Sequence, residues 1–418
     1  MNLQAKEPDF DDISEWIQRQ LDFTGDPGLA VAVVKDGEIV FAKGFGWADK
    51  ENRRKADEHT AYSIASISKP ITATGIQLLA QAGKIEIDQP ANKYLGKAKI
   101  RNPFGEADEI SVRQLLNHTS GLGLHFQFYY QADGYPVPNR DTTIRHYGIA
   151  TRKPGETYYY CNLGYGILDY IIARRSGRDY PQFIQQALFD PMGMKHSFIG
   201  LPTEKRNNVA VRYDRQGNAI PLYEFDHDGG SAVYASAYDL ALFALLHLGD
   251  AFQEVLSPKH VQQMKEPTGE IGPGSGYGMG WRMDKGDYEI ISHTGGMPGV
   301  ATRLSLVPEQ KLAVVSLSNK ESSLPHQAVK KILSEILDNY PYDRPNLLLP
   351  ARRKSIPAFK VSDDFIGTWS GRIETYEGPR QLQLWIGRDG DCRARIEGQL
   401  VTVITNPGLN GGMLTGIF

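Results

Sequence analysis

The chain has 418 residues, of which 41% are hydrophobic and 23% charged, and its formal net charge is −3 at pH 7. A single core stops growing at about 250–300 residues, so a chain of this length is expected to form more than one domain. The balanced charge argues against binding to nucleic acid or to an anionic membrane, and no apolar stretch is long enough to span a bilayer.

The N-terminus and the cysteines bear on the compartment. Residues 1–9 contain no apolar signal core. The two cysteines, Cys161 and Cys392, lie far apart in the sequence, so a disulfide is not expected. We therefore predict a cytoplasmic protein with free thiols, or a periplasmic or secreted one if the sequence has been trimmed.

The first predicted elements are a helix and a β-hairpin. Apolar residues recur on one helical face over residues 11–21. Residues 29–34 and 38–46 then alternate around Lys35-Asp36-Gly37, which is a strong hairpin signal. A second helix is expected over residues 71–82, because Gly83 follows the apolar period as a stop signal.

Helices dominate from Ser66 to about Lys265. Ser111 and Ser236 are predicted N-caps within this region, and a further helix is expected to end at Gly177. The last predicted elements are strands at 277–284, 288–292, 300–307 and 312–318 and a helix at 325–337. Since strands lie at both ends, they are expected to pair. The predicted fold class is α/β (α+β), an antiparallel sheet flanked by helices with an all-helical insert.

The most informative motif is Ser66-Ile67-Ser68-Lys69. Residues three apart on a helix are neighbours, so the Lys69 amine can reach the Ser66 hydroxyl. A serine hydroxyl is a weak nucleophile until a nearby base takes its proton. Ser66 is predicted at a helix N-terminus, where backbone N–H groups favour developing negative charge. Taken alone, the motif favours the simpler interpretation of an N-cap serine and a solvated surface lysine.

Two later motifs favour the catalytic interpretation, namely Tyr160-Cys161-Asn162 and His293-Thr294-Gly295. In this order the three motifs resemble those of the serine β-lactamase and penicillin-binding protein superfamily, nearest to class C β-lactamases, D-aminopeptidases and β-lactamase-like carboxylesterases. The resemblance extends from about Pro27 to about Leu337.

The resemblance implies roles for these residues. Ser66 would be the acylated nucleophile, Lys69 its proton partner and Tyr160 a second acid/base. Asn162 would contact a substrate amide, and the strand with His293 and Thr294 would form the far wall of the pocket. Gly295 follows in this strand, and the N–H groups of Ser66 and Gly296 would hold the oxyanion. No metal and no organic cofactor are expected.

Two departures from the family pattern bear on substrate. Cys161 replaces a common serine and is expected to be a packing residue. His293 replaces the usual lysine, as in the D-aminopeptidase branch and some esterase-like relatives. A histidine is mostly neutral at pH 7.5 and would offer a hydrogen bond in place of a charge. We therefore predict poor turnover of penicillins and of other substrates that need a carboxylate contact.

Three functions remain open. The first is a D-stereospecific amidase or aminopeptidase acting on small or peptide substrates. The second is a carboxylesterase with weak β-lactam turnover, and the third is an inactive binding protein that kept the fold. The intact Ser66, Lys69 and Tyr160 argue against the third. A homo-oligomer is possible in each case.

The predicted domains are a hydrolase domain at 1–338, with its helical subdomain at about 66–265, a proline-rich linker at 339–358 and a small antiparallel β domain at 359–418. Gly367-Thr368-Trp369 resembles a lipocalin-like opening. About sixty residues are few for a closed barrel of eight strands, so a partial or truncated barrel is expected. Asp226-His227-Asp228 is interpreted as a loop and not as a metal site, because zinc-type ligand spacing is missing elsewhere.

Overall fold

The computed structural model describes residues 8–106, 109–201, 205, 209–340, 362–375, 378–388, 391–410 and 413–417. Contacts divide the chain into two units. The first comprises residues 1–125 and 130–342, and the second comprises residues 126–129 and 343–418. The predicted linker lies outside the described residues from residue 341 onward.

A nine-stranded antiparallel sheet forms the centre of the first unit, in the order β3-β2-β1-β14-β13-β12-β11-β10-β9. Its strands are β1 (Gly28–Lys35), β2 (Glu38–Asp49), β3 (Arg54–Lys55), β9 (Gly269–Gly272), β10 (Ser275–Tyr277), β11 (Arg282–Lys285), β12 (Glu289–Met297), β13 (Val300–Val307) and β14 (Leu312–Ser318). Strand β1 pairs with β14, with Leu29 opposite Ser318. The predicted pairing of early and late strands is confirmed.

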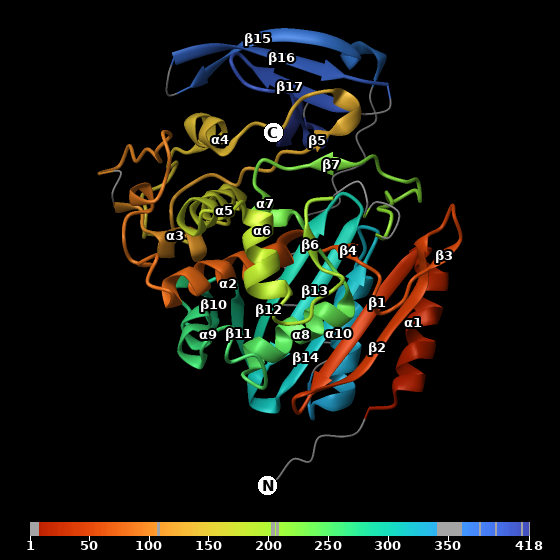
Figure 1. Cartoon of the computed structure of the whole chain (residues 1–418). Coiled ribbons are helices and arrows are strands. Elements are labelled where there is room, and N and C mark those ends of the chain that lie inside the picture. Colours follow the sequence, from red (N-terminus) through yellow and green to blue (C-terminus); the bar gives the residue numbers. More distant parts are fainter. Residues whose placement is uncertain are drawn as a thin grey trace. The chain divides into compact units, whose positions relative to one another are not determined.

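Helices cover both faces of this sheet (Figure 1). The helices α1 (Phe10–Thr24) and α10 (Leu324–Ile336) pack on one face, where Leu29, Val31 and Val33 join their apolar core. Helix α8 (Ala237–Leu248) packs against β1 and β14. Because side chains alternate along a strand, a strand covered on both faces must be apolar throughout, and β14 is buried along its whole length.

The remaining helices belong to the predicted insert, and they include the element that carries the site. They are α2 (Ser68–Gln81), α3 (Val112–Leu116), α4 (Arg140–Tyr147), α5 (Asn162–Ser176), α6 (Tyr180–Ile184), α7 (Asp228–Ser231) and α9 (Pro258–Met264). Ser111 caps α3 in a capping box and Ser236 caps α8, as predicted. A small sheet with the order β4-β8-β6 is formed by β4 (Tyr62–Ser63), β6 (Phe198–Ile199) and β8 (Val233–Ala235). Because β6 and β8 fall within residues 66–265, the insert is not all-helical as predicted.

Two predicted boundaries are wrong. The strand expected at 277–284 is divided into β10 and β11, because Gly280 takes a φ of +82° between them. The strand expected to end at Ser292 continues to Met297, since Gly295 and Gly296 pair with β13. Local propensity marks glycine as a strand breaker, but the tertiary pairing overrides it here.

The described residues of the second unit form strands and one short 3-10 helix, Asp363–Phe365. A four-stranded sheet contains β15 (Gly367–Thr375), β16 (Gly378–Ile386), β17 (Cys392–Ile396) and β18 (Thr402–Val403), and a separate pair contains β19 (Thr405–Asn410) and β20 (Met413–Ile417). Its small core includes Ile386, Cys392, Ala394 and Ile404. The truncated lipocalin-like barrel stays a prediction.

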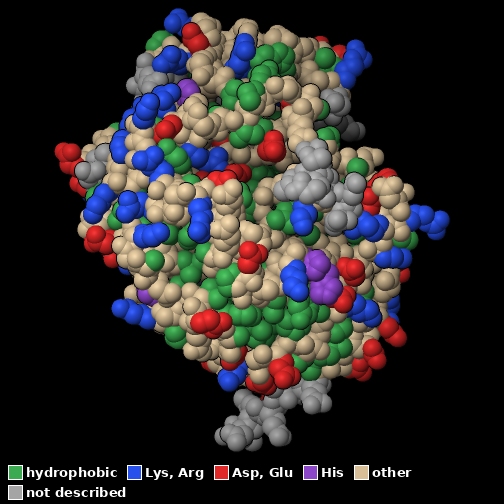
Figure 2. All heavy atoms as spheres, in the orientation of Figure 1, with side chains coloured by type: hydrophobic (Ala, Val, Ile, Leu, Met, Phe, Trp, Pro, Cys, Tyr) green, Lys and Arg blue, Asp and Glu red, His purple; other side chains and the backbone are tan. Residues whose placement is uncertain are grey.

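Side chains of both charge signs lie on the surface of the protein (Figure 2). Figure 2 shows basic and acidic side chains interspersed over the face that it draws, which agrees with the net charge of −3. Among the described residues, none of the helices is both long and apolar enough to cross a bilayer.

Candidate active site

Ser66 lies on a tight connection between a strand and a helix. Strand β4 ends at Ser63, a 3-10 turn covers Ala65–Ile67, and α2 begins at Ser68. Ser66 therefore lies in the 3-10 turn that leads directly into α2, two residues before its first residue, which agrees with the predicted place at a helix N-terminus. Ala65 takes a φ of +46°, a strained value for a residue with a Cβ. Ser66 is half-buried while its neighbours are buried, so the turn presents its hydroxyl.

The Lys69 amine has three partners and is fully buried. Its Nζ lies 3.0 Å from Ser66 Oγ, 2.8 Å from Asn162 Oδ1 and 2.9 Å from the carbonyl oxygen of Gly230. The Asn162 amide is oriented, because its Nδ2 donates to the carbonyl of His125 at 2.9 Å. The structure thus brings Ser66, Lys69 and Asn162 together, as predicted, and adds the Gly230 carbonyl.

These partners suit a neutral amine. Burial lowers the pKa of Lys69 well below its usual value, although the field of Cys161 opposes the shift. A neutral amine has two N–H donors and one lone pair. The carbonyl oxygens of Asn162 and Gly230 can only accept, so they take the two N–H groups. In this neutral form the lone pair faces the Ser66 hydroxyl, which is the arrangement a general base needs, whereas protonated Lys69 donates a third N–H to Ser66 Oγ.

Tyr160 lies next to Cys161, the N-cap residue of helix α5, and two residues before the helix begins. Its ring centre lies 4.7 Å from Lys69 Nζ. Burial raises the pKa of Tyr160 above its usual value, and a hydrogen bond with Ser66 opposes that shift. The phenol therefore keeps its proton at neutral pH and can donate it. The next residue, Cys161, is the N-cap of α5, and its buried Sγ accepts from the N–H of Gly164 at 3.1 Å.

His118 contacts both Cys161 and Tyr160 of the tyrosine motif. Its Nδ1 accepts from the backbone N–H of Cys161 at 3.1 Å, and its ring lies 4.3 Å from that of Tyr160. The ring is fully buried, with a backbone φ of +62°. His118 thus acts here as a structural residue that positions Tyr160.

The end of β12 forms the opposite wall. Strand β11 pairs with β12 only as far as Ser292, so the edge of β12 beyond that residue is open. A Cβ at Gly295 would come within 2.3 Å of the Ile64 carbonyl, so only glycine lets the strand approach the turn that bears Ser66. Thr294 and Gly296 are exposed, and a Cβ at Gly296 would meet nothing within 4 Å. The wall therefore leaves space above Gly296.

His293 differs from the expectation. Its Nδ1 lies 2.7 Å from the Thr294 carbonyl oxygen, which can only accept, so Nδ1 carries the proton. Its Nε2 then accepts from the Tyr277 hydroxyl at 2.8 Å. Burial and the field of Lys69 lower the pKa of His293 to about 3. The ring is thus neutral with both nitrogens engaged by the protein, so it offers a substrate neither charge nor a free N–H.

Three further polar side chains form a cluster near the site. His125, Asp226 and His227 place their ligand-type atoms within 4.8 Å of one another. Asp226 Oδ1 lies 2.8 Å from His125 Nε2 and 2.9 Å from His227 Nδ1. These are hydrogen-bond lengths, shorter than the roughly 3.3 Å between donor atoms around a tetrahedral ion. Hydrogen bonding thus accounts for the cluster, while Asp228 turns instead to Arg140.

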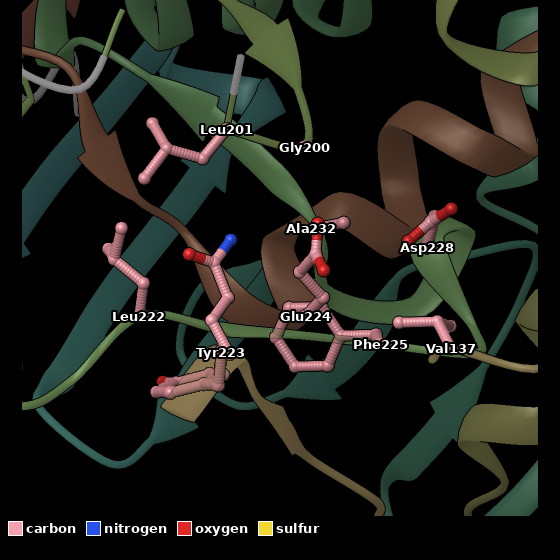
Figure 3. Close-up of a pocket in the computed structure, with 10 residues that line it drawn as sticks. Val137, Gly200, Leu201, Leu222, Tyr223, Glu224, Phe225, Asp228 and Ala232 are labelled. Carbon is pink, nitrogen blue, oxygen red and sulfur yellow. The ribbon is translucent and has the colours of Figure 1, made fainter. Parts of the chain in front are cut away.

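A cavity of about 220 Å³ lies beside α7. Its lining combines apolar side chains with two carboxylates, and the lining residues include Val137, Leu201, Leu222, Phe225, Glu224 and Asp228. Figure 3 shows Glu224 extending toward Ala232. Asp228 lines this cavity, while Gly230 of the same short helix holds Lys69. The described residues that line it include no lysine, arginine or histidine.

The family model described as Beta-lactamase matches residues 13–336. This chain belongs to the β-lactamase family. Members of this family are generally serine hydrolases, and the predicted relationship to β-lactamases and penicillin-binding proteins is confirmed.

Curated relatives include Protein flp of Staphylococcus aureus (strain MW2), 26% identical over 328 residues, which are 76% of this chain and 64% of that protein. A penicillin-binding protein of Bacillus subtilis (strain 168) is 26% identical over 364 residues, covering 81% of this chain and 78% of its own. The chain thus spans about two thirds of the length of the flp protein.

Solved structures agree on the fold. The octameric penicillin-binding protein homologue from Pyrococcus abyssi aligns with 98% of this chain and 95% of its own, with a TM-score of 0.67 and 26% identity. A class C beta-lactamase aligns with 79% of this chain and 96% of its own, with a TM-score of 0.67 and 21% identity. The predicted antiparallel sheet flanked by helices is confirmed.

Several residues of this β-lactamase-family site were missed from the sequence. The Gly230 carbonyl belongs to no motif, because a backbone oxygen leaves no trace in residue types. Tyr277 pairs with His293 from a neighbouring part of the sheet, 16 residues earlier in the chain. The sequence predicts only a loop at Asp226 and His227, because their partner His125 is 101 residues from Asp226.

Proposed function

We propose that this protein is a serine hydrolase that forms an acyl-enzyme on Ser66 and cleaves amide or ester bonds of small or peptide substrates, in the manner of D-aminopeptidases. The observation that carries the proposal is the buried Lys69 amine, 3.0 Å from Ser66 Oγ with both N–H groups engaged. A base held in this way can take the serine proton without first losing one of its own to solvent.

The proposed reaction has two steps. Ser66 Oγ attacks the substrate carbonyl while its proton moves to Lys69 Nζ, and the oxyanion is held by the N–H groups of Ser66 and Gly296. Tyr160 donates its proton to the leaving nitrogen or oxygen and regains one from the Lys69 ammonium. Water then attacks the acyl-enzyme, with its proton returning through the same groups, and the product acid leaves.

Charge around the site bears on the substrate. His293 is neutral, and Arg282, the cation whose field reaches it, is paired with Asp284 at 2.8 Å. A substrate carboxylate would therefore find little charge assistance at this wall. Of the two carboxylates that line the cavity beside α7, Asp228 is already paired with Arg140 at 2.8 Å, so Glu224 is the one that would attract a substrate ammonium group. This favours a substrate with an ammonium group over penicillins or over peptides that are recognised by their C-terminal carboxylate.

A carboxylesterase with weak β-lactam turnover is the second candidate, because an uncharged ester also suits a wall without a free cation.

We further propose that the protein self-associates, as its octameric homologue does, and light scattering of the purified chain tests this.

The test is a turnover panel with wild type and Ser66→Ala. It includes p-nitrophenyl esters, D- and L-aminoacyl anilides and nitrocefin, together with intact-mass detection of a fluorophosphonate adduct mapped to Ser66. We expect aminoacyl anilides to exceed nitrocefin, and Ser66→Ala to lose both turnover and adduct. Equal labelling of Ser66→Ala would remove the nucleophile assignment, and faster nitrocefin turnover would remove the substrate assignment.

A further inference from the structure

The buried cluster of His125, Asp226 and His227 has no part in the reaction steps above. Asp226 and His227 are fully buried, and the His125 side chain is 5% exposed. Both histidines contact the same carboxylate oxygen, Asp226 Oδ1, at 2.8 and 2.9 Å. A carboxylate can only accept, so each histidine donates an N–H. Thr143 donates to the other oxygen, Oδ2, at 3.1 Å.

Each histidine also holds one of the two acceptors of Lys69. The carbonyl oxygen of His125 accepts from Asn162 Nδ2 at 2.9 Å, and this bond turns Asn162 Oδ1 toward Lys69. The carbonyl oxygen of His227 accepts from the N–H of Gly230 at 2.9 Å, and the Gly230 carbonyl faces Lys69. The two histidines are 102 positions apart, and Asp226 joins them.

The packing leaves His227 little freedom. A Cβ at Gly166 would lie 2.7 Å from the Cβ of His227, so α5 touches the histidine directly. A Cβ at Gly230 would lie 3.2 Å from His227 Cδ2 and 3.7 Å from Lys69 Nζ. A shift of His227 is thus transmitted to the peptide that holds Lys69.

We propose that Asp226 is a positioning residue for the Ser66–Lys69 pair. By fixing His125 and His227, it fixes the two carbonyl oxygens that bind the N–H groups of neutral Lys69, and so keeps the lone pair of that amine on Ser66. The inference rests on the proposed function, because it assigns Lys69 the role of base. Misplacing a catalytic group by about 1 Å can cost about 100-fold in rate.

The test compares Asp226→Asn with Asp226→Ala. Because both histidines use one oxygen, the Asn amide oxygen can keep both hydrogen bonds while its NH2 donates to Thr143. We expect Asp226→Asn to stay within about 5-fold of wild type in kcat. Asp226→Ala is expected to lose about 100-fold in kcat with KM within about 3-fold, and to regain part of the loss with added formate.

A matched control is Asp239→Ala, which removes another buried carboxylate, one that binds His196 and Ser197. It should lower Tm and leave kcat within about 2-fold. If Asp226→Ala does not fold, His125→Phe decides, with an expected loss of about 10-fold in kcat.

The outcomes separate the two proposals. If wild type forms no fluorophosphonate adduct at Ser66, the proposed function fails whatever the variants do. If wild type is labelled and Asp226→Ala is labelled at the same rate, only the positioning role is overturned. An Asp226→Asn loss as large as that of Asp226→Ala overturns it too, since the acceptor oxygen would be retained. If Asp226→Ala does not fold but His125→Phe does, an unchanged kcat in His125→Phe overturns the positioning role.

Discussion

The charged and polar groups on the two sides of helix α7 differ in how far they are exposed to water. On one side Gly230 faces Lys69, where the amine is fully buried and all three of its partners lie within 3.0 Å. On the other side Asp228 and Glu224 line a cavity that reaches solvent, and Glu224 is exposed. Burial makes the first environment sensitive to every hydrogen bond, whereas water weakens each interaction in the second. The comparison predicts that substitutions of the buried groups around Ser66 change turnover strongly, whereas substitutions in the cavity change it little.

The largest effect is expected from Lys69→Ala. Without the base, turnover should fall about 1,000-fold, within the range for general-base removal, with KM nearly unchanged. Because the pKa of Lys69 is held well below 10.5, the wild-type rate should rise with pH well below that value, as the ammonium loses its proton. A pH profile of kcat/KM checks both points. A profile with the same acid limb in Lys69→Ala would assign the base elsewhere.

Tyr160→Phe should come next, with a loss of about 100-fold in kcat. Its buried phenol has a raised pKa, so it acts as an acid, and the wild-type rate should not fall near pH 10. The loss should be larger for anilides than for p-nitrophenyl esters, whose leaving group needs no proton. Equal losses on both substrates would contradict the role as acid.

In the cavity, Glu224→Gln should raise KM for cationic aminoacyl substrates by about 3-fold, the size expected for an exposed ion pair. Neutral esters should be unaffected, and 0.5 M salt should weaken the wild-type preference. Glu270→Gln, another exposed acid on β9, is the matched control. An equal change in KM for neutral esters would mean that Glu224 does not select substrates by their charge.

The smallest effect is expected from Cys161→Ser. The serine hydroxyl can accept from the Gly164 N–H as the thiol does, so kcat should stay within about 2-fold and Tm should not fall. Burial raises the pKa of Cys161 to about 12, so iodoacetamide should leave wild type active. Rapid inactivation at Cys161 would show that the pocket opens to the reagent.

Residue types and spacing alone determined the three motifs, most of the sheet and the relationship between Ser66 and Lys69. These are local properties, because a three-residue helical spacing and an alternating strand are set by the backbone of one segment. The same holds for the Ser111 and Ser236 caps, whose bonds reach only three residues ahead.

Only the tertiary structure decided what those motifs do. The pKa of Lys69 depends on burial, and the orientation of its amine depends on the Gly230 carbonyl, 161 residues away. His293 has no nitrogen free for a substrate because Tyr277 occupies its Nε2. His125 and His227 are linked because both bind the Asp226 carboxylate. Each is a contact between segments that the chain brings together on folding, and charge in a buried site is set by such contacts and by the loss of water, neither of which a sequence motif contains.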